Sequence, residues 1–164
     1  MAFGRNKVEW MHVVERVHIS ASADTVWRFV ASAQAIPLYM GALRGYADPD
    51  SPVGEVGERQ CIEYLRGGQL VTEVIEVIEL TPGQRAVTTY VEPADPPTRG
   101  TTEVMPDPDG GCWLSEGYSI AIPRQQVGTA EREVLKPARA GLRAIQALQK
   151  ARIEEGWTLP EWRA

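Results

Sequence analysis

The sequence is poor in the residues that mark several common functional classes. Acidic residues outnumber basic ones by 22 to 17, giving a formal net charge of −5, and no long basic run occurs. Binding to nucleic acid requires a basic face, which this chain does not offer. There are only two histidines, His12 and His18, and no cysteine or carboxylate stands near them at ligand spacing. We therefore expect no metal site.

Long apolar runs are missing as well. No stretch reaches the roughly 20 residues that a membrane-spanning helix needs, and the N-terminus lacks the apolar core of a signal peptide. We therefore expect a cytoplasmic protein in which Cys61 and Cys112, the only two cysteines, stay free and buried. A length of 164 residues with 43% apolar and 24% charged residues suits one globular domain over residues 1–164, with an irregular tail at 157–164.

Hydrophobic periodicity divides the chain into three parts. Residues 8–19 alternate, which predicts a strand that buries Met11, Val13, Val17 and Ile19. Two short helices are predicted next, over 24–30 and around 34–40. The first has a serine cap at Ser20 or Ser22, and the second is bent by Pro37.

Turn residues then punctuate a run of predicted strands, so consecutive strands with short connections indicate an antiparallel meander. The six strands are expected near 42–48, 58–66, 69–80, 85–92, 98–105 and 112–122. The period changes again over residues 127–153, where an amphipathic helix is predicted with Pro137 as a kink. Its apolar stripe comprises Val134, Ala138, Leu142, Ile145 and Leu148.

This order of elements resembles the START/Bet v 1-like (SRPBCC) superfamily, in particular its polyketide cyclase/dehydrase branch. The stretches that carry the resemblance are His18–Trp27, Ile36-Pro37, Val56-Gly57, Glu79–Arg85 and Ala151–Gly156. The resemblance implies an α+β helix-grip fold. In that fold a curved antiparallel sheet of about seven strands wraps around the long C-terminal helix, with two short helices after the first strand and an apolar cavity between sheet and helix.

The stretch 72–80 sets Glu73, Glu76 and Glu79 into an apolar run. Its Val and Ile content and the flanking turns favour a strand over a helix. Period two then puts Glu76 on one face and the other two glutamates on the opposite face. The resemblance places the face of Glu76 toward the cavity, together with Thr72, Val74 and Ile78, and leaves Glu73 and Glu79 outside.

The last strand gives a second inward carboxylate. Its bulky face comprises Leu114, Glu116, Tyr118 and Ile120, which we expect to point into the cavity. A buried carboxyl has a raised pKa, so Glu76 and Glu116 are candidate acid/base residues, with Tyr118 beside them. The remaining expected contacts with a ligand are Met40, Tyr64, Val134, Ala138 and Leu142.

Two alternatives stay open for these glutamates. An arginine such as Arg59, Arg66, Arg99 or Arg139 can neutralise an inward carboxylate within a purely structural network. A bulge that shifts the register by one residue sends Glu76 outside and brings Ile75 or Val77 in. Aromatic polyketide aromatase/cyclases also place an inward arginine on the matching strand, and residues 70–80 contain none. First-ring aromatase chemistry is therefore not expected.

The resulting hypothesis is a cofactor-independent cyclase or dehydratase that acts on a hydrophobic, polyketide-like intermediate. One alternative is a non-catalytic carrier of a hydrophobic small molecule, in which the same carboxylates only orient the ligand. Another is a partner-binding module that uses an apolar patch around Trp157 and Trp162. The expected partner is a small molecule, without nucleic acid or membrane, and the protein is a monomer or homodimer.

Overall fold

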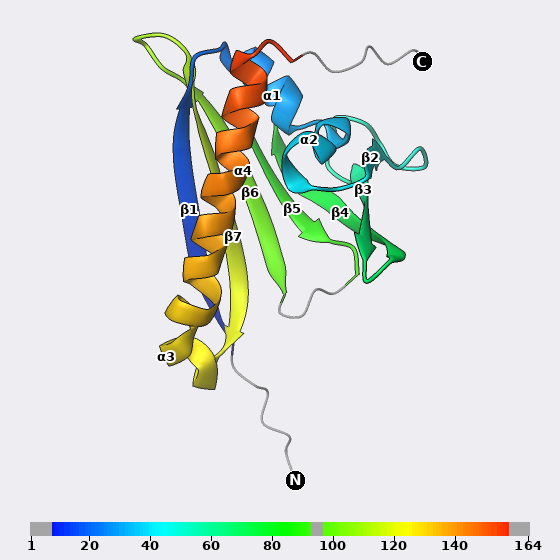
Figure 1. Ribbon diagram of the computed structural model, residues 1–164, viewed down its shortest axis with the longest axis vertical. Coiled ribbons are helices and arrows are strands. Elements are labelled where there is room, and N and C mark those ends of the chain that lie inside the picture. Colours follow the sequence, from blue (N-terminus) through cyan, green and yellow to red (C-terminus); the bar gives the residue numbers. More distant parts are fainter. Residues whose placement is uncertain (1–7, 93–96, 158–164) are drawn as a thin grey trace.

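The computed structural model describes residues 8–92 and 97–157. A seven-stranded antiparallel sheet curves beside a long C-terminal helix, and two short helices follow the first strand (Figure 1). The α+β helix-grip fold expected from the sequence is confirmed. The strands are β1 (Val8–Ile19), β2 (Arg44–Ala47), β3 (Arg59–Arg66), β4 (Gln69–Thr81), β5 (Arg85–Tyr90), β6 (Thr98–Pro106) and β7 (Cys112–Pro123).

The sheet is a meander in which the first strand joins the last. The order across the sheet is β1-β7-β6-β5-β4-β3-β2, and each neighbouring pair is antiparallel. Each strand from β2 to β6 therefore pairs with the strand that follows it in the chain. This arrangement places β7, which carries Glu116, between β1 and β6.

Local sequence explains the short helices. Helix α1 (Ala23–Val30) begins after Ser22, whose Oγ accepts a hydrogen bond of 3.1 Å from the Thr25 amide. A 3-10 turn over Ala33–Ala35 leads into α2 (Pro37–Met40), which starts on its proline and ends at Gly41 in the left-handed conformation. These short elements bring Val26, Phe29 and Tyr39 into the core.

The C-terminal helical region is irregular before Pro137. A 3-10 turn over Arg124–Gln126 and α3 (Val127–Ala130) lead into a π-helical turn over Glu131–Leu135, and α4 spans Lys136–Glu154. Proline has no amide hydrogen to donate to the preceding turn, so a disturbance at this point is expected. The predicted kink therefore appears as a widened turn.

The face that α4 buries differs from the predicted stripe. Leu142, Gln146, Gln149 and Ile153 are buried, whereas Leu148 is 45% exposed. The spacing 142, 146, 149, 153 is a regular helical stripe, but two of its members are glutamines. A stripe chosen from apolar residues alone therefore includes the exposed Leu148 and omits the buried glutamines.

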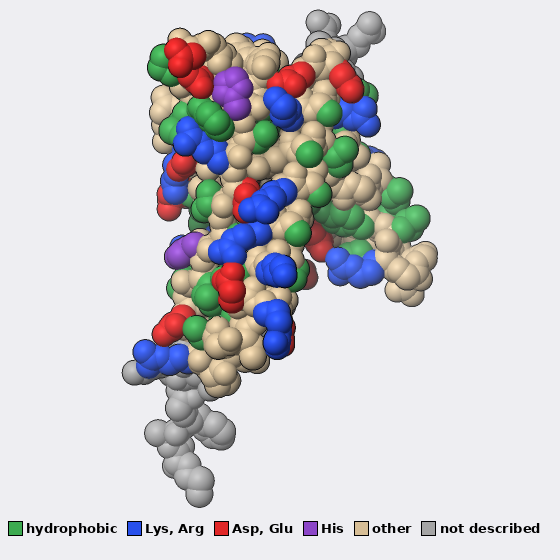
Figure 2. Space-filling model, turned by 60° about the vertical axis from the view of Figure 1, so that its left-hand side comes forward, with side chains coloured by type: hydrophobic (Ala, Val, Ile, Leu, Met, Phe, Trp, Pro, Cys, Tyr) green, Lys and Arg blue, Asp and Glu red, His purple; other side chains and the backbone are tan. Residues whose placement is uncertain are grey.

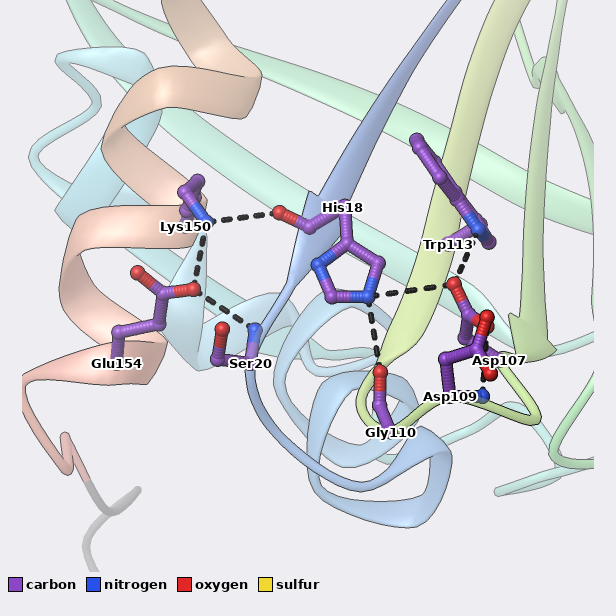
Figure 3. A network of polar contacts seen from close by, with 8 residues as sticks. All are labelled: His18, Ser20, Asp107, Asp109, Gly110, Trp113, Lys150 and Glu154. Carbon is purple, nitrogen blue, oxygen red and sulfur yellow. Dashed lines mark hydrogen bonds and ion pairs between the residues drawn. The ribbon is translucent and has the colours of Figure 1, made fainter.

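A polar network ties the end of α4 to the end of the sheet (Figure 3). Lys150 Nζ donates to the His18 carbonyl oxygen at 2.8 Å and pairs with Glu154. On the other side of His18, its Nε2 bonds the Gly110 carbonyl oxygen at 2.9 Å, and Trp113 Nε1 donates to Asp107. The network closes the turn between β6 and β7 onto β1, which explains why His18 lies outside the cavity.

The predicted burial of the cysteines is confirmed, since Cys61 and Cys112 are both free and buried. Trp157 is 42% exposed, and Trp162 lies outside the described residues, as does most of the tail predicted at 157–164. Among the described residues, no helix is long and apolar enough to cross a membrane.

Candidate functional site

A cavity of about 330 Å³ lies between the concave face of the sheet, the short helices and α4. Its wall is mainly apolar and aromatic, as ligand sites usually are. The principal lining residues are Trp27, Ile36, Tyr39, Met40, Gln60, Ile62, Tyr64, Ile75, Val77, Leu80, Ala86, Thr88, Tyr90, Thr102, Glu116, Tyr118, Leu142 and Ile145. Figure 2 shows the molecule hollowed beside the C-terminal helix, with basic side chains along the outward surface of that helix.

Glu76 does not face this cavity. It stands directly opposite Arg59 in the β3–β4 pair, and Arg59 Nε donates to Glu76 Oε2 at 3.1 Å. Its neighbours Ile75 and Val77 line the cavity instead. The predicted inward orientation of Glu76 is therefore wrong.

A bulge explains the error. The register of β4 against β5 shifts between Val77 and Glu79, so one extra residue is inserted there. Leu80, after the bulge, lines the cavity, and counting back from it in steps of two gives the wrong face before the bulge. The alternative of a register shift, which brings Ile75 and Val77 inward, is the one that holds.

The other expected contacts on β4 change for the same reason. Thr72 and Val74 stand opposite Glu63 and Cys61, on the face of Glu76, and Ile78 lies at the bulge. None of these three residues lines the cavity. Their predicted role as ligand contacts is therefore corrected.

Glu73 was expected on the outer face, but it shares the concave face with Ile62, which it opposes. Arg66 Nη2 donates to its carboxylate at 2.9 Å. The charge of Glu73 also contributes to raising the pKa of Tyr64 and of Tyr90, although burial is the larger cause for both. An ion pair therefore lies beside the cavity, next to two of its tyrosines.

The face of β7 agrees with the prediction. Glu116 and Tyr118 line the cavity. Leu114 and Ile120 share their strand face but lie in the two hydrophobic clusters of the core, and neither lines the cavity. Glu116 stands opposite Thr102 of β6, a second polar residue of the wall.

The other expected contacts divide into two groups. Met40, Tyr64 and Leu142 line the cavity, as predicted. Val134 packs against the cluster of Ile120 and Leu135 instead, and Ala138 is not among the lining residues. Val134 lies within the π-helical turn, which changes the helical phase there, so it does not continue the stripe of α4.

Glu116 meets two glutamines from α4 at one end of the cavity. Gln149 Nε2 donates to Glu116 Oε1 at 3.0 Å. The second carboxylate oxygen, Oε2, is buried and has no hydrogen-bond partner, and the same is true of Gln149 Oε1. Burial raises the pKa of Glu116, and the amides of Gln149 and Gln146 offset part of that rise.

Two phenols lie beside this carboxyl group. Burial and the charge of Glu116 raise the pKa of Tyr118 to about 12. The same two causes raise the pKa of Tyr39, which the Gln149 amide partly offsets. Both phenols therefore stay protonated at neutral pH and can donate hydrogen bonds to an oxygen atom held near Glu116.

A second carboxylate, Glu15, stands opposite Glu116 on β1. Arg143 Nε donates to its carboxylate at 2.9 Å, and Gln146 donates to its backbone carbonyl at 3.0 Å. Glu15 is thus neutralised by α4. Glu116 has no such cation, because the described residues that line the cavity include no lysine, arginine or histidine.

Among the site residues that the sequence did not reveal as candidates, Tyr39, Tyr90 and Gln149 bear on its chemistry. Tyr39 and Tyr90 line the cavity, and Gln149 is fully buried behind Glu116. The signal for Gln149 was available, because two glutamines at 146 and 149 continue the helical stripe of Leu142. Tyr39 lies in a four-residue helix that gives no periodicity to read.

The described residues hold no group of three or more histidine, cysteine, aspartate or glutamate side chains that could bind a metal ion. The chemistry that the site itself offers is proton transfer. A carboxyl group with a raised pKa keeps its proton to a higher pH than usual and can act as acid or base, and the neighbouring phenols can stabilise charge on an oxygen.

Comparison with known proteins matches most of the sequence to a protein-family model. Residues 11–150 match the family model described as polyketide cyclase/dehydrase and lipid transport. None of the curated proteins matches the chain significantly.

Solved structures share the fold at low sequence identity. A Staphylococcus aureus protein of unknown function has a TM-score of 0.74 at 12% identity, with 92% of this chain and 97% of that chain covered. Norcoclaurine synthase from Thalictrum flavum, a point mutant in complex with a transition-state analogue, has a TM-score of 0.67 at 17% identity, with coverages of 92% and 98%. The di-domain aromatase/cyclase of the steffimycin pathway has a TM-score of 0.64 at 15% identity; 90% of this chain covers 51% of that one.

Proposed function

The chain belongs to the polyketide cyclase/dehydrase and lipid transport family, and we propose that its cavity binds a hydrophobic small molecule whose cyclisation or dehydration Glu116 promotes by proton transfer. The observation that carries the proposal is the placement of Glu116. Its carboxyl group lines an otherwise largely apolar and aromatic cavity of about 330 Å³ and keeps one oxygen free.

The proposed chemistry uses one carboxyl group instead of the pair inferred from the sequence. Because burial raises the pKa of Glu116, the group keeps its proton to a higher pH than an ordinary glutamate and can donate it, and the resulting carboxylate can take a proton from carbon or oxygen. Tyr39 and Tyr118 keep their protons and can donate to the oxygen on which charge develops. Glu76 has no part in this scheme.

The loss of Glu76 from the cavity also favours the alternative of a non-catalytic carrier. With Glu58 held by hydrogen bonds and only Glu116 keeping an unpaired oxygen, the cavity can hold a hydrophobic ligand without chemistry, and Glu116 then only orients it. The two functions share the binding step and differ in turnover, so they are tested separately.

Binding is tested with N-phenyl-1-naphthylamine, an apolar dye whose fluorescence rises in apolar sites. We expect saturable binding to the purified protein and its loss in Ile75→Trp, which fills the cavity with an indole. Val74→Trp is the matched control, because Val74 is adjacent to Ile75 on β4 and lies on the other face of the sheet. Equal binding by both variants contradicts the proposed cavity site.

Catalysis is tested by turnover of a poly-β-ketone thioester analogue, followed by mass spectrometry. Glu116→Gln should lower kcat by roughly 100-fold, within the usual contribution of a general acid or base. Glu76→Gln, which removes the same charge from the other face, should retain full activity. Turnover that is unchanged in Glu116→Gln refutes the catalytic role, and dye binding without any turnover identifies a carrier.

A further inference from the structure

Glu116, which lines the cavity, has a hydrogen-bond acceptor without a donor, and Gln149, which lies behind it, has a second. Glu116 Oε2 and Gln149 Oε1 are both buried, and neither has a partner among the described residues. Buried polar atoms in folded proteins are almost always paired, and an unpaired acceptor costs stability. These two atoms therefore mark a place where an additional donor group belongs.

The orientation of the Gln149 amide is fixed by its neighbour. Its nitrogen donates to Glu116 Oε1 at 3.0 Å, so its own oxygen cannot turn to that position without facing an ionised carboxylate. The oxygen is left as an acceptor beside the carboxyl group. A donor that satisfies both atoms must carry at least two hydrogens, which a single hydroxyl group does not have.

The charged residues that line the cavity indicate whether the missing donor group is neutral or positively charged. The described lining residues include two glutamates, Glu58 and Glu116, and no basic side chain. Glu58 is satisfied at its own position, because Gly54 donates its amide and Gln60 donates its side chain to that carboxylate. Two arginines of the neighbouring elements are engaged elsewhere, Arg143 by Glu15 and Arg66 by Glu73. Glu116 is thus the lining carboxylate that keeps a buried oxygen without a partner.

The remaining wall is rich in aromatic rings. Tyr39, Tyr64, Tyr90, Tyr118 and Trp27 all line the cavity. Aromatic faces attract cations, and they do so more strongly where water is excluded. A cavity that combines these rings with one uncompensated carboxylate is built for a positively charged group on an apolar body.

We infer that the ligand of this cavity carries a protonated primary or secondary amine, which donates to Glu116 Oε2 and Gln149 Oε1 while its apolar part lies among the tyrosines. This inference rests on the proposed binding function and narrows it to a chemical class. Such a group supplies two donor hydrogens and neutralises Glu116 in one contact. A neutral ligand leaves the carboxylate without a cation.

The test compares two probes of nearly equal shape, naphthylethylamine and naphthylethanol, by isothermal titration calorimetry and by displacement of N-phenyl-1-naphthylamine. Charge-assisted hydrogen bonds contribute enough for about a tenfold preference for the amine at neutral pH. Glu116→Gln should remove that preference and leave the affinity for the alcohol within about twofold. Glu76→Gln is the control of equal charge, and it should keep the preference.

Each outcome separates the inference from the function on which it rests. Equal affinity of the wild-type protein for both probes overturns the amine inference and leaves the binding function standing. A preference for the amine that persists in Glu116→Gln also overturns it. If neither probe nor the dye binds, the cavity is not a ligand site and both proposals fail.

Discussion

Replacing Glu116 by glutamine is expected to stabilise the unliganded protein at neutral and higher pH. In the wild-type protein Glu116 Oε2 is a buried acceptor without a partner. Leaving such a group unpaired costs about 1–3 kcal/mol, and more when it is charged. The Glu116→Gln variant has no charge to desolvate, and it places an amide nitrogen at that position beside Gln149 Oε1. We therefore expect its free energy of unfolding to be higher by about 1–3 kcal/mol at pH 8.

The sign of the pH dependence follows from the direction of the pKa shift. Burial raises the pKa of Glu116 in the folded state above that of the unfolded chain, about 4.3. Below the unfolded value both states are protonated, so the carboxyl group causes no penalty. As pH rises through the window between the unfolded and folded pKa values, the folded wild type loses stability, and above that window the full penalty is present. The gap between variant and wild type should open across the same window.

Groups that face Glu116 do not cancel this effect. Tyr39 and Tyr118 stay protonated, because their pKa values are raised. Glu15 on the adjacent strand is paired with Arg143, a contact that both proteins retain. The change of one side chain therefore isolates the titration of Glu116 itself.

Urea unfolding at pH 4 and at pH 8 measures the effect. A gain of 1 kcal/mol in a domain of this size corresponds to a rise in Tm of about 2–4 °C. Glu76→Gln is the control, because its partly exposed pair with Arg59 contributes only about 0–1 kcal/mol. A Glu116→Gln variant that is less stable than the wild type at pH 8, or equally shifted at both pH values, refutes the reasoning.

Two further predictions test the packing around the cavity by thermal denaturation. Gly45→Ala should destabilise strongly, because its new methyl group would lie 1.9 Å from the Ala33 carbonyl oxygen. Gly141→Ala is the control on the exposed side of α4, where a methyl group meets nothing within 4 Å, and it should stabilise by about 0.5–1 kcal/mol. Equal effects of the two changes contradict the fold around Gly45. Leu114→Ala should cost about 2–5 kcal/mol, because Leu114 is fully buried beside the cavity wall, and a loss below 1 kcal/mol argues against its place in the core.

Much of the fold could be predicted because local patterns agree with the tertiary structure. The strand predicted over 8–19 has those bounds in the structure, and the other predicted strands differ by a few residues at their ends. Alternation along β7 correctly placed Glu116 and Tyr118 on the concave face. Nothing interrupts the pairing of β7 with β1 or β6, so period two holds along the whole strand.

The orientation of Glu76 could not be predicted, because it depends on a single inserted residue. The bulge between Val77 and Glu79 reverses the faces on which the residues of β4 lie. The residues around the bulge are as β-branched as those in a regular strand, so the sequence does not mark it. The pairing partner decides the matter, since Glu76 faces Arg59 and Ile75 faces Gln60. Pairing is a relation between two strands, so a pattern within one strand does not contain it.

The polar end of the cavity is a local conflict in an otherwise consistent structure. Glu116 interrupts a strand face of Leu114, Tyr118 and Ile120, and Gln149 interrupts the buried stripe of α4. An apolar pair at these positions would avoid the burial of an unpartnered carboxylate, and replacing buried charges in this way often raises stability. The two residues come from separate elements, and Gln149 contacts Glu116 from behind the cavity wall that Glu116 lines. When an unpartnered buried group lies where a ligand can bind and pair with it, ligand binding explains why the group is there.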